Sequence, residues 1–104
     1  MNLQKYLALV KTVESGSFTK AAVALNYTQS GISRMIKDLE TEWGVYLLER
    51  NRAGVSLTSD GLKLLPQIQR ICNEHDILKR QIEDLHDMRS GLIRAVPRPL
   101  TRSG

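Results

Sequence analysis

The segment 29–43 constrains the fold of this 104-residue chain more than any other part of the sequence. Placed on an α-helix at about 100° per residue, its apolar side chains share one face: Ile32, Met35, Ile36, Leu39 and Trp43. The other face holds only groups that hydrogen-bond or carry charge: Gln29, Ser30, Ser33, Arg34 and Lys37. The pattern predicts a helix that packs one side on a domain and offers the other side to the major groove of DNA.

Composition bounds the fold class but does not decide the function. The length suits one domain rather than two with separate cores. Lys and Arg number 15 against 11 Asp and Glu, a net charge of +4, which is compatible with a polyanionic partner but is also common in small proteins without one. Aromatic residues make up 5% of the chain and strand-like alternation is scarce, so the predicted fold class is mainly α.

The cellular compartment is predicted from what the sequence lacks. Cys72 is the single cysteine, so no disulfide forms within the chain, and we interpret it as a small buried apolar residue rather than a redox sensor. The N-terminus has no signal-peptide core, and no apolar run approaches the roughly 20 residues that span a membrane. We therefore expect a cytoplasmic protein with no membrane partner.

Two shorter helices are expected before segment 29–43. Residues 2–15 carry an apolar stripe at helical spacing, with Leu9 at its edge: Leu3, Tyr6, Leu7, Val10 and Val13. Ser17 is suited to cap a second helix over 18–25, and Thr28 to cap the third. Tyr27 is expected to fill the corner between them. Two helices joined by so tight a turn predict a helix-turn-helix.

A small β-hairpin is expected after the third helix. The short apolar segments 45–50 and 55–57 flank the turn sequence Asn51-Arg52-Ala53-Gly54, a pattern typical of hairpins. Attached to a helix-turn-helix, such a hairpin forms a wing. Arg52 at its tip is the better candidate for a narrow minor groove, whereas Arg50 either contacts DNA or pairs with a carboxylate of the domain.

The last predicted helix, 59–89, is long and begins at the cap residue Thr58. Pro66 is expected to bend its first turns. Its seam residues follow the 3,4 spacing of a coiled coil: Leu64, Ile68, Ile71, His75, Leu78, Ile82 and Leu85. A stripe this long cannot be buried on a three-helix domain, so it predicts dimerisation. His75, its one polar member, is interpreted as a tolerated break, although two facing histidines would make association pH-sensitive.

These elements divide the chain into three predicted parts. Residues 1–58 form a winged helix-turn-helix DNA-binding domain, and residues 59–90 form a linker and dimerisation helix. Residues 91–104 are expected to be a disordered tail because of their Pro and Arg content, although the stretch 91–96 could open a strand.

At this point the chain resembles the LysR-type transcriptional regulators over about residues 1–92. The resemblance is carried first by the motif Gly16-Ser17-Phe18-Thr19-x-Ala21-Ala22, Leu25-Asn26, and Thr28-Gln29-Ser30-x-Ile32-Ser33-Arg34-x-Ile36-Lys37-x-Leu39-Glu40. It continues through Gly44-Val45-x-Leu47-Leu48-x-Arg50 and Leu57-Thr58-x-x-Gly61. The chain departs from the family at Gly31, which costs roughly 1 kcal/mol of helix propensity relative to Ala.

The resemblance implies a winged helix-turn-helix that dimerises through the long helix and acts in the bacterial nucleoid. In the family this domain precedes a two-lobed domain that binds a small-molecule inducer, and full-length members are usually tetramers. That effector domain is missing here, so we expect a truncated regulator or a fragment, without an inducer site of its own.

The expected partner is double-stranded DNA, and each contact is predicted from its place on the helices. Base readout is assigned to Gln29, Ser30, Ser33 and Arg34. Phosphate contacts are assigned to Ser17, Thr19, Lys20, Thr28 and Lys37, partly because helix N-termini attract phosphate. The alternative for each of these residues is an ordinary solvated polar face.

The sequence contains no constellation typical of catalysis or metal binding. We therefore predict no enzyme activity, no metal and no cofactor. The alternative function is an interaction module that pairs with full-length relatives through helix 59–89 and modulates them.

Overall fold

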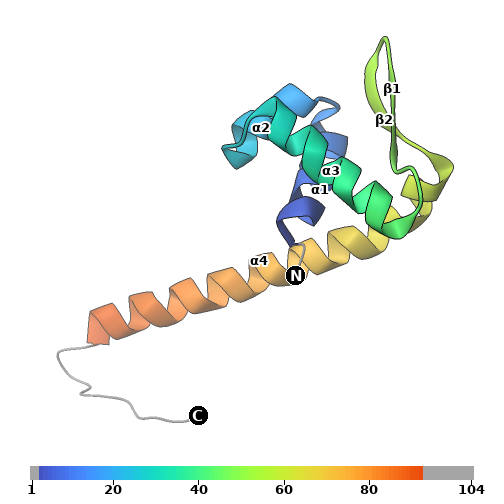
Figure 1. The fold of residues 1–104 in the computed structure, drawn as a ribbon. Helices are drawn as coiled ribbons and strands as arrows, with labels where there is room; N and C mark the ends of the chain where they lie inside the picture. Colours follow the sequence, from blue (N-terminus) through green and yellow to red (C-terminus); the bar gives the residue numbers. More distant parts are fainter. Residues whose placement is uncertain (1–2, 93–104) are drawn as a thin grey trace. The chain divides into compact units, whose positions relative to one another are not determined.

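The computed structural model describes residues 3–92, which form four α-helices and one antiparallel hairpin (Figure 1). In chain order the elements are α1 (Leu3–Ser15), α2 (Phe18–Leu25), α3 (Gln29–Trp43), β1 (Leu48–Asn51), β2 (Gly54–Leu57) and α4 (Ser59–Leu92). The chain divides into two units, of which the first runs through Cys72 and the second begins at Asn73. The first unit therefore holds the three short helices, the hairpin and the start of α4.

The ends of α2 and α3 are set by the predicted capping residues. The Ser17 hydroxyl accepts a hydrogen bond from the Lys20 backbone N–H at 3.1 Å, and the Thr28 hydroxyl accepts one from the Gly31 N–H at 3.0 Å. Asn26 ends α2 in the left-handed conformation, with φ 64°. Each cap satisfies a backbone group that the helix itself cannot, so the predicted helix-turn-helix is confirmed.

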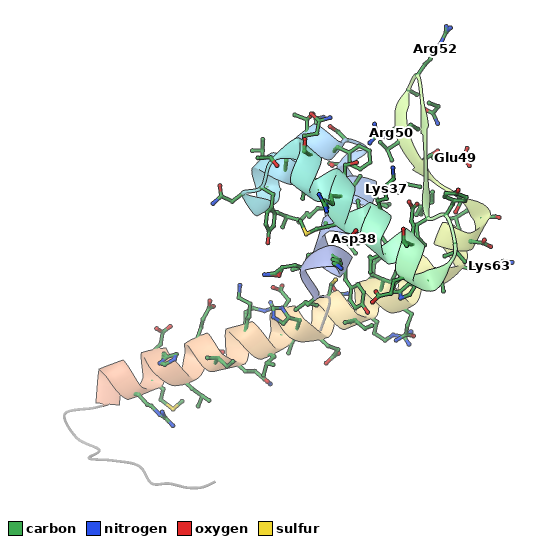
Figure 2. The ribbon with its side chains drawn as sticks, viewed as in Figure 1. Lys37, Asp38, Glu49, Arg50, Arg52 and Lys63 are labelled. Carbon is green, nitrogen blue, oxygen red and sulfur yellow. The ribbon has the colours of Figure 1, made fainter. Side chains whose placement is uncertain are left out.

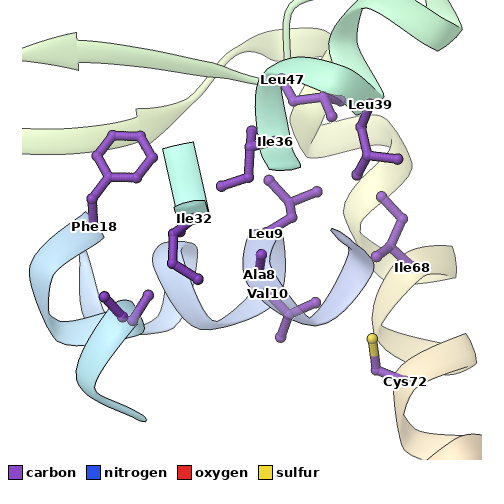
Figure 3. Packing of buried hydrophobic residues seen from close by; sticks show 12 residues of the cluster. Ala8, Leu9, Val10, Phe18, Ile32, Ile36, Leu39, Leu47, Ile68 and Cys72 are labelled. Carbon is purple, nitrogen blue, oxygen red and sulfur yellow. The ribbon is translucent and has the colours of Figure 1, made fainter. Parts of the chain in front are cut away.

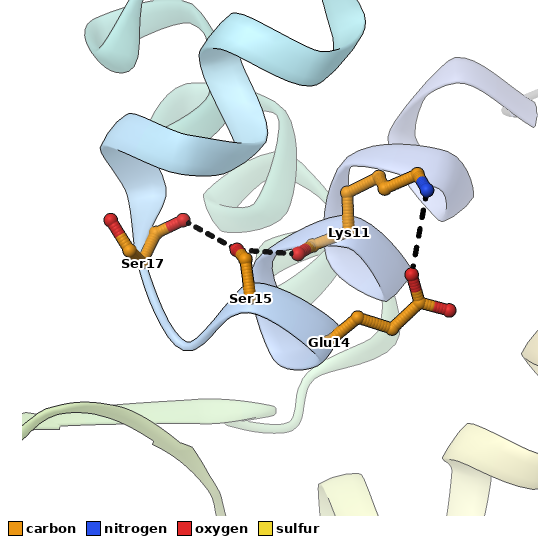
Figure 4. Close-up of polar contacts among 4 residues, drawn as sticks. All are labelled: Lys11, Glu14, Ser15 and Ser17. Atoms are coloured by element: carbon orange, nitrogen blue, oxygen red, sulfur yellow. Dashed lines mark hydrogen bonds and ion pairs between the residues drawn. The ribbon is translucent and has the colours of Figure 1, made fainter.

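The turn from α1 to α2 is held by a single hydroxyl. The Ser15 hydroxyl lies 2.8 Å from the Lys11 carbonyl oxygen and 3.1 Å from that of Ser17, so its proton serves both carbonyls (Figure 4). Lys11 also forms an ion pair of 3.5 Å with Glu14 on the exposed side of α1. The corner after α2 differs from expectation, because Tyr27 is 42% exposed and does not fill it.

The core of the first unit lies where α1, α2 and α3 cross (Figure 3). Its buried hydrophobic residues are Ala8, Leu9, Val10, Phe18, Ala21, Ala22, Ile32, Ile36, Leu39, Leu47, Ile68 and Cys72. The predicted apolar face of α3 is confirmed, with Met35 and Trp43 partly buried at its margin. Leu9, predicted at the edge of its stripe and available for a second contact, is 1% exposed, because α1 packs against both α2 and α3.

The hairpin begins three residues later than predicted and includes two of the four turn residues. Its register pairs Leu48 with Leu57 and Asn51 with Gly54. Segment 45–47 is not a strand because its backbone donors are bound elsewhere. The Glu40 carboxylate accepts hydrogen bonds from the N–H groups of Leu47 at 2.7 Å and Leu48 at 3.1 Å.

Helix α4 continues past Pro66 and ends at Leu92, beyond the predicted end at residue 89. Gly91 and Leu92 are helical, which corrects both the strand suggested for 91–96 and the tail suggested from residue 91. A lone glycine lowers helix propensity by only about 1 kcal/mol and does not by itself end a helix. The remainder of the predicted tail, 93–104, lies outside the described residues.

Gly61 allows α4 to start close against the two ends of the hairpin, at Leu47 and Leu57. A Cβ atom at this position would overlap the Leu47 carbonyl oxygen and lie 2.9 Å from Leu57 Cδ2. The same carbonyl accepts the Thr58 N–H at 3.0 Å, so it is not free to move away. The absence of a side chain therefore fixes where the hairpin and α4 meet.

Gly61→Ala is expected to lower the free energy of unfolding by about 1–3 kcal/mol, the usual cost of overpacking. Urea unfolding followed by circular dichroism measures this, with Lys63→Ala on the exposed side of the same helix as the control. Stabilisation by the Gly61 variant, as helix propensity alone would give, contradicts the close contact.

Cys72 is 7% exposed in the core, as its interpretation as a buried apolar residue requires. Burial raises the pKa of its thiol above the ordinary value of 9.0, and the negative charge of Glu14 raises it further. The folded thiol thus holds its proton to higher pH than the unfolded one. The stability linked to this proton is fully present below the unfolded pKa and is lost as pH rises through the folded pKa.

We therefore expect the free energy of unfolding to fall more steeply above pH 9.0 in the parent chain than in Cys72→Ala. Urea unfolding of both chains at a series of alkaline pH values provides the comparison. Parallel pH profiles would show that the thiol ionises equally well in the folded and unfolded states.

Candidate DNA interface

The polar face of α3 is open to solvent, opposite the side that the core buries. Gln29, Ser30, Arg34 and Lys37 are exposed, and Ser33 is half-buried. The predicted division of this helix into two faces is therefore confirmed. The exposed face forms one wall of an open groove, whose lining residues are Gln29, Ser30, Ser33, Arg34, Lys37, Asp38, Thr41 and Arg50.

The hairpin supplies the other wall and carries the two predicted wing arginines. Arg50 on β1 lies beside α3, whereas exposed Arg52 follows β1 at the tip of the hairpin (Figure 2). Near the tip, the Asn51 side-chain amide donates to the Ser56 hydroxyl at 3.2 Å, which ties the two strands together. The hairpin thus carries one cationic side chain beside α3 and a second one at its tip.

Arg50 is paired with α3 and α2 rather than with a carboxylate. Its guanidinium Nη2 donates to the Ser33 hydroxyl oxygen at 2.9 Å. Its guanidinium carbon lies 4.5 Å from the centre of the Phe18 ring, a cation–π contact. Within residues 3–92 it forms no ion pair with a carboxylate, so the alternative of an ion pair with the domain is corrected.

The hydroxyl groups predicted to contact phosphates already have partners within the chain. Ser17 and Thr28 accept backbone hydrogen bonds as helix caps, and each remains at a helix N-terminus. The Thr19 hydroxyl donates to the Gln29 side-chain oxygen at 3.2 Å. Lys20 and Lys37 are exposed.

Three features of this groove were not predicted from the sequence. Asp38 lies on its wall, and its charge is offset by an ion pair of 3.7 Å with Lys5 of α1. The contacts Thr19–Gln29 and Arg50–Ser33 join residues 10 and 17 positions apart. Asp38 could have been found, because it follows Lys37 on the same arc, whereas no periodicity signals the two long-range contacts.

The predicted seam of α4 divides between different environments. In the first unit Ile68 is 4% exposed and belongs to the core of the protomer. This corrects its assignment to the dimer interface, because its side chain packs α4 against the rest of the first unit. Leu64 is exposed and Ile71 half-buried. In the second unit Leu78 and Leu85 are about half exposed, at 52% and 53%. Ile82 is exposed as well, and His75 is half-buried.

Residues 3–92 contain neither a metal-binding cluster nor a membrane-spanning helix. No group of three or more His, Cys, Asp or Glu side chains in this range is placed to hold a metal ion. None of the helices in the same range combines the length and apolar character that crossing a membrane requires.

Known proteins resemble this chain in sequence. The model of the bacterial regulatory helix-turn-helix protein family, lysR, matches residues 3–62. A probable nitrogen assimilation transcriptional activator of Synechococcus elongatus is 40% identical over 85 residues, which are 82% of this chain and 27% of that protein. The transcriptional regulator CrgA of Neisseria meningitidis serogroup C is 36% identical over 93 residues, 89% of this chain and 31% of CrgA.

Solved structures resemble the chain as well. The DNA-binding domain of BenM in complex with catB site 1 DNA matches with a TM-score of 0.73 and 32% identity, over 83% of this chain and 97% of that domain. The DNA-binding domain of CbnR in complex with DNA matches with a TM-score of 0.70 and 28% identity, over 83% and 99%. The chain spans less than a third of the length of the two curated relatives. It has the predicted mainly α, winged helix-turn-helix fold, and it belongs to the LysR family of bacterial regulatory helix-turn-helix proteins.

Proposed function

We propose that this chain is the DNA-binding part of a transcriptional regulator and that it recognises an interrupted inverted repeat as a dimer. The observation that carries the proposal is the exposed polar face of α3, which stands beside a hairpin carrying two arginines. A helix of this kind fits the major groove while a wing follows the backbone or enters the minor groove. Two of the solved structures that the chain resembles are DNA-binding domains in complex with DNA, those of CbnR and BenM.

The proposed base-reading residues are the ones that project from the first half of α3: Gln29, Ser30, Ser33 and Arg34. Arg34 is exposed, and a guanidinium suits the two acceptors of guanine or a phosphate. Register on the duplex is set by groups at the two helix N-termini and further along the exposed face: Ser17, Lys20, Thr28 and Lys37. The phosphate contact predicted for Thr19 is not part of this proposal, because its hydroxyl hydrogen is donated to Gln29. Arg52 at the hairpin tip is assigned to a minor groove.

Dimerisation is assigned to α4. Leu78, Ile82 and Leu85 recur at seam spacing in the second unit and are exposed in the protomer. Burying such residues against a second helix removes apolar surface from water. In this proposal the distance between the two recognition helices, and hence the spacing of the half-sites, is set by the paired α4 helices.

Arg34→Ala is expected to weaken binding to the preferred duplex by roughly 1–3 kcal/mol, about 5- to 150-fold, because one base or phosphate contact is lost. Fluorescence anisotropy with a labelled duplex measures this loss. Arg70→Ala is the matched control, since it removes the same charge from an exposed position on α4, outside the groove. The thermal midpoint of unfolding should not change, and an equal loss of stability and affinity would contradict the assignment of Arg34 to the exposed face.

Selection from a random duplex library tests the proposal as a whole. We expect enrichment of an interrupted inverted repeat, with an affinity that falls steeply as salt rises, because phosphate contacts release counterions. Retention without an enriched motif would leave only electrostatic binding. Absence of retention even at low salt would overturn the proposal and favour pairing with a full-length relative through α4.

A further inference from the structure

Two of the proposed reading residues, Gln29 and Ser33, stand one helical turn apart on α3 and are each held by a side chain from another element. Thr19 of α2 donates to the Gln29 side-chain oxygen at 3.2 Å. Arg50 of β1 donates to the Ser33 hydroxyl oxygen at 2.9 Å. In both contacts the side-chain oxygen of the reading residue accepts a hydrogen bond. Each contact therefore leaves the reading residue with its own N–H or O–H hydrogens to donate to another group.

A serine hydroxyl has one hydrogen to donate and two lone pairs that accept. Arg50 occupies an acceptor position of Ser33 with a charged donor, and charge-assisted bonds of this kind are stronger than neutral ones. The hydroxyl hydrogen of Ser33 is therefore left to point away from Arg50. For Gln29 the contact with Thr19 engages the side-chain oxygen and leaves the two amide hydrogens free.

Arg50 is itself fixed before any DNA arrives. Its guanidinium lies over the Phe18 ring, 4.5 Å from the ring centre, and Phe18 is part of the buried core. A planar guanidinium can stack flat on a ring and donate from its edge in a fixed geometry, which a flexible, point-like ammonium group does not reproduce. Ser33 is half-buried, so its hydroxyl is shielded on the side where Arg50 binds.

We propose that Arg50 and Thr19 are positioning residues for sequence readout, which present Ser33 and Gln29 to DNA as hydrogen-bond donors. The inference rests on the proposed function and deepens it. The ligand chemistry is a base edge with acceptors, namely purine N7, guanine O6 or thymine O4, in preference to the amino groups of adenine or cytosine. Arg50 then acts through Ser33, while Arg52 remains the residue that reaches DNA from the hairpin.

A double-mutant cycle between Arg50→Ala and Ser33→Ala tests the first pair. It uses the full chain and the duplex obtained by selection, together with duplexes varied at each base of one half-site. Each single variant should reduce discrimination at the same base positions by roughly fivefold or more, and the double variant should lose no more than the worse single variant. Arg52→Ala is the matched control, and its effect should add to that of Ser33→Ala.

Two further variants separate positioning from charge and from folding. Arg50→Lys keeps the charge but not the planar stack, so its discrimination should fall as in Arg50→Ala while the salt dependence of binding stays unchanged. Thr19→Val keeps the shape of Thr19 but removes its donor, and its effect should be non-additive with that of Gln29→Ala. Circular dichroism of each variant is the folding control, and the helical content is expected to match that of the parent.

The proposal is overturned if Arg50→Ala weakens all duplexes equally, adds to Ser33→Ala and lowers the salt slope by about one, because that is the signature of a phosphate contact. It is also overturned if the preferred bases facing Ser33 and Gln29 offer donors. If the parent chain enriches no motif, the proposed function itself fails, because bases are then not read and Arg50 has no reading residue to orient.

Discussion

Three side chains of α3, namely Ile32, Ile36 and Leu39, are almost wholly withdrawn from water, and the first unit is arranged around them. They are buried against α1 and α2, which fixes the rotation of α3 about its own axis. Because side chains on opposite arcs of a helix cannot share an environment, this rotation also places the polar arc in solvent. The open groove is thus a consequence of core packing, and no polar contact is needed to point Arg34 outward.

Glu40 joins the hairpin to this same helix. Its carboxylate accepts the backbone N–H groups of Leu47 and Leu48 at 2.7 and 3.1 Å, while its backbone carbonyl accepts those of Gly44 and Val45 at 2.8 and 3.2 Å. Hydrogen bonds from N–H groups to a charged acceptor are stronger than those to a neutral one. One residue therefore joins the end of α3 to the start of β1 and helps to hold the hairpin beside α3.

The polar face of α3 is exposed, but two of its side chains are restrained by hydrogen bonds from other elements. Side chains that are mobile in the free protein lose entropy when a ligand orders them, and that loss opposes binding. The contact from Thr19 to Gln29 and the contact from Arg50 to Ser33 restrict two of these side chains in advance. The second contact also links β1 to α3, so the hairpin and the face of α3 share one support.

The sequence alone determined every feature that depends on local periodicity or on a capping residue. The starts of α2 and α3 follow from Ser17 and Thr28, and their ends follow from Asn26 and Gly44. The two faces of α3 follow from its 3.6-residue repeat, because capping and periodicity both depend on residues within one or two turns of each other. Only the tertiary structure decided which part of each stripe is buried and which polar groups meet. Leu9 and Ile68 are in the core because other elements cover them, and Arg50 meets Ser33 because Glu40 and Gly61 bring the hairpin there. Contacts between residues far apart along the chain depend on how elements pack, and that packing leaves no periodic trace in the sequence.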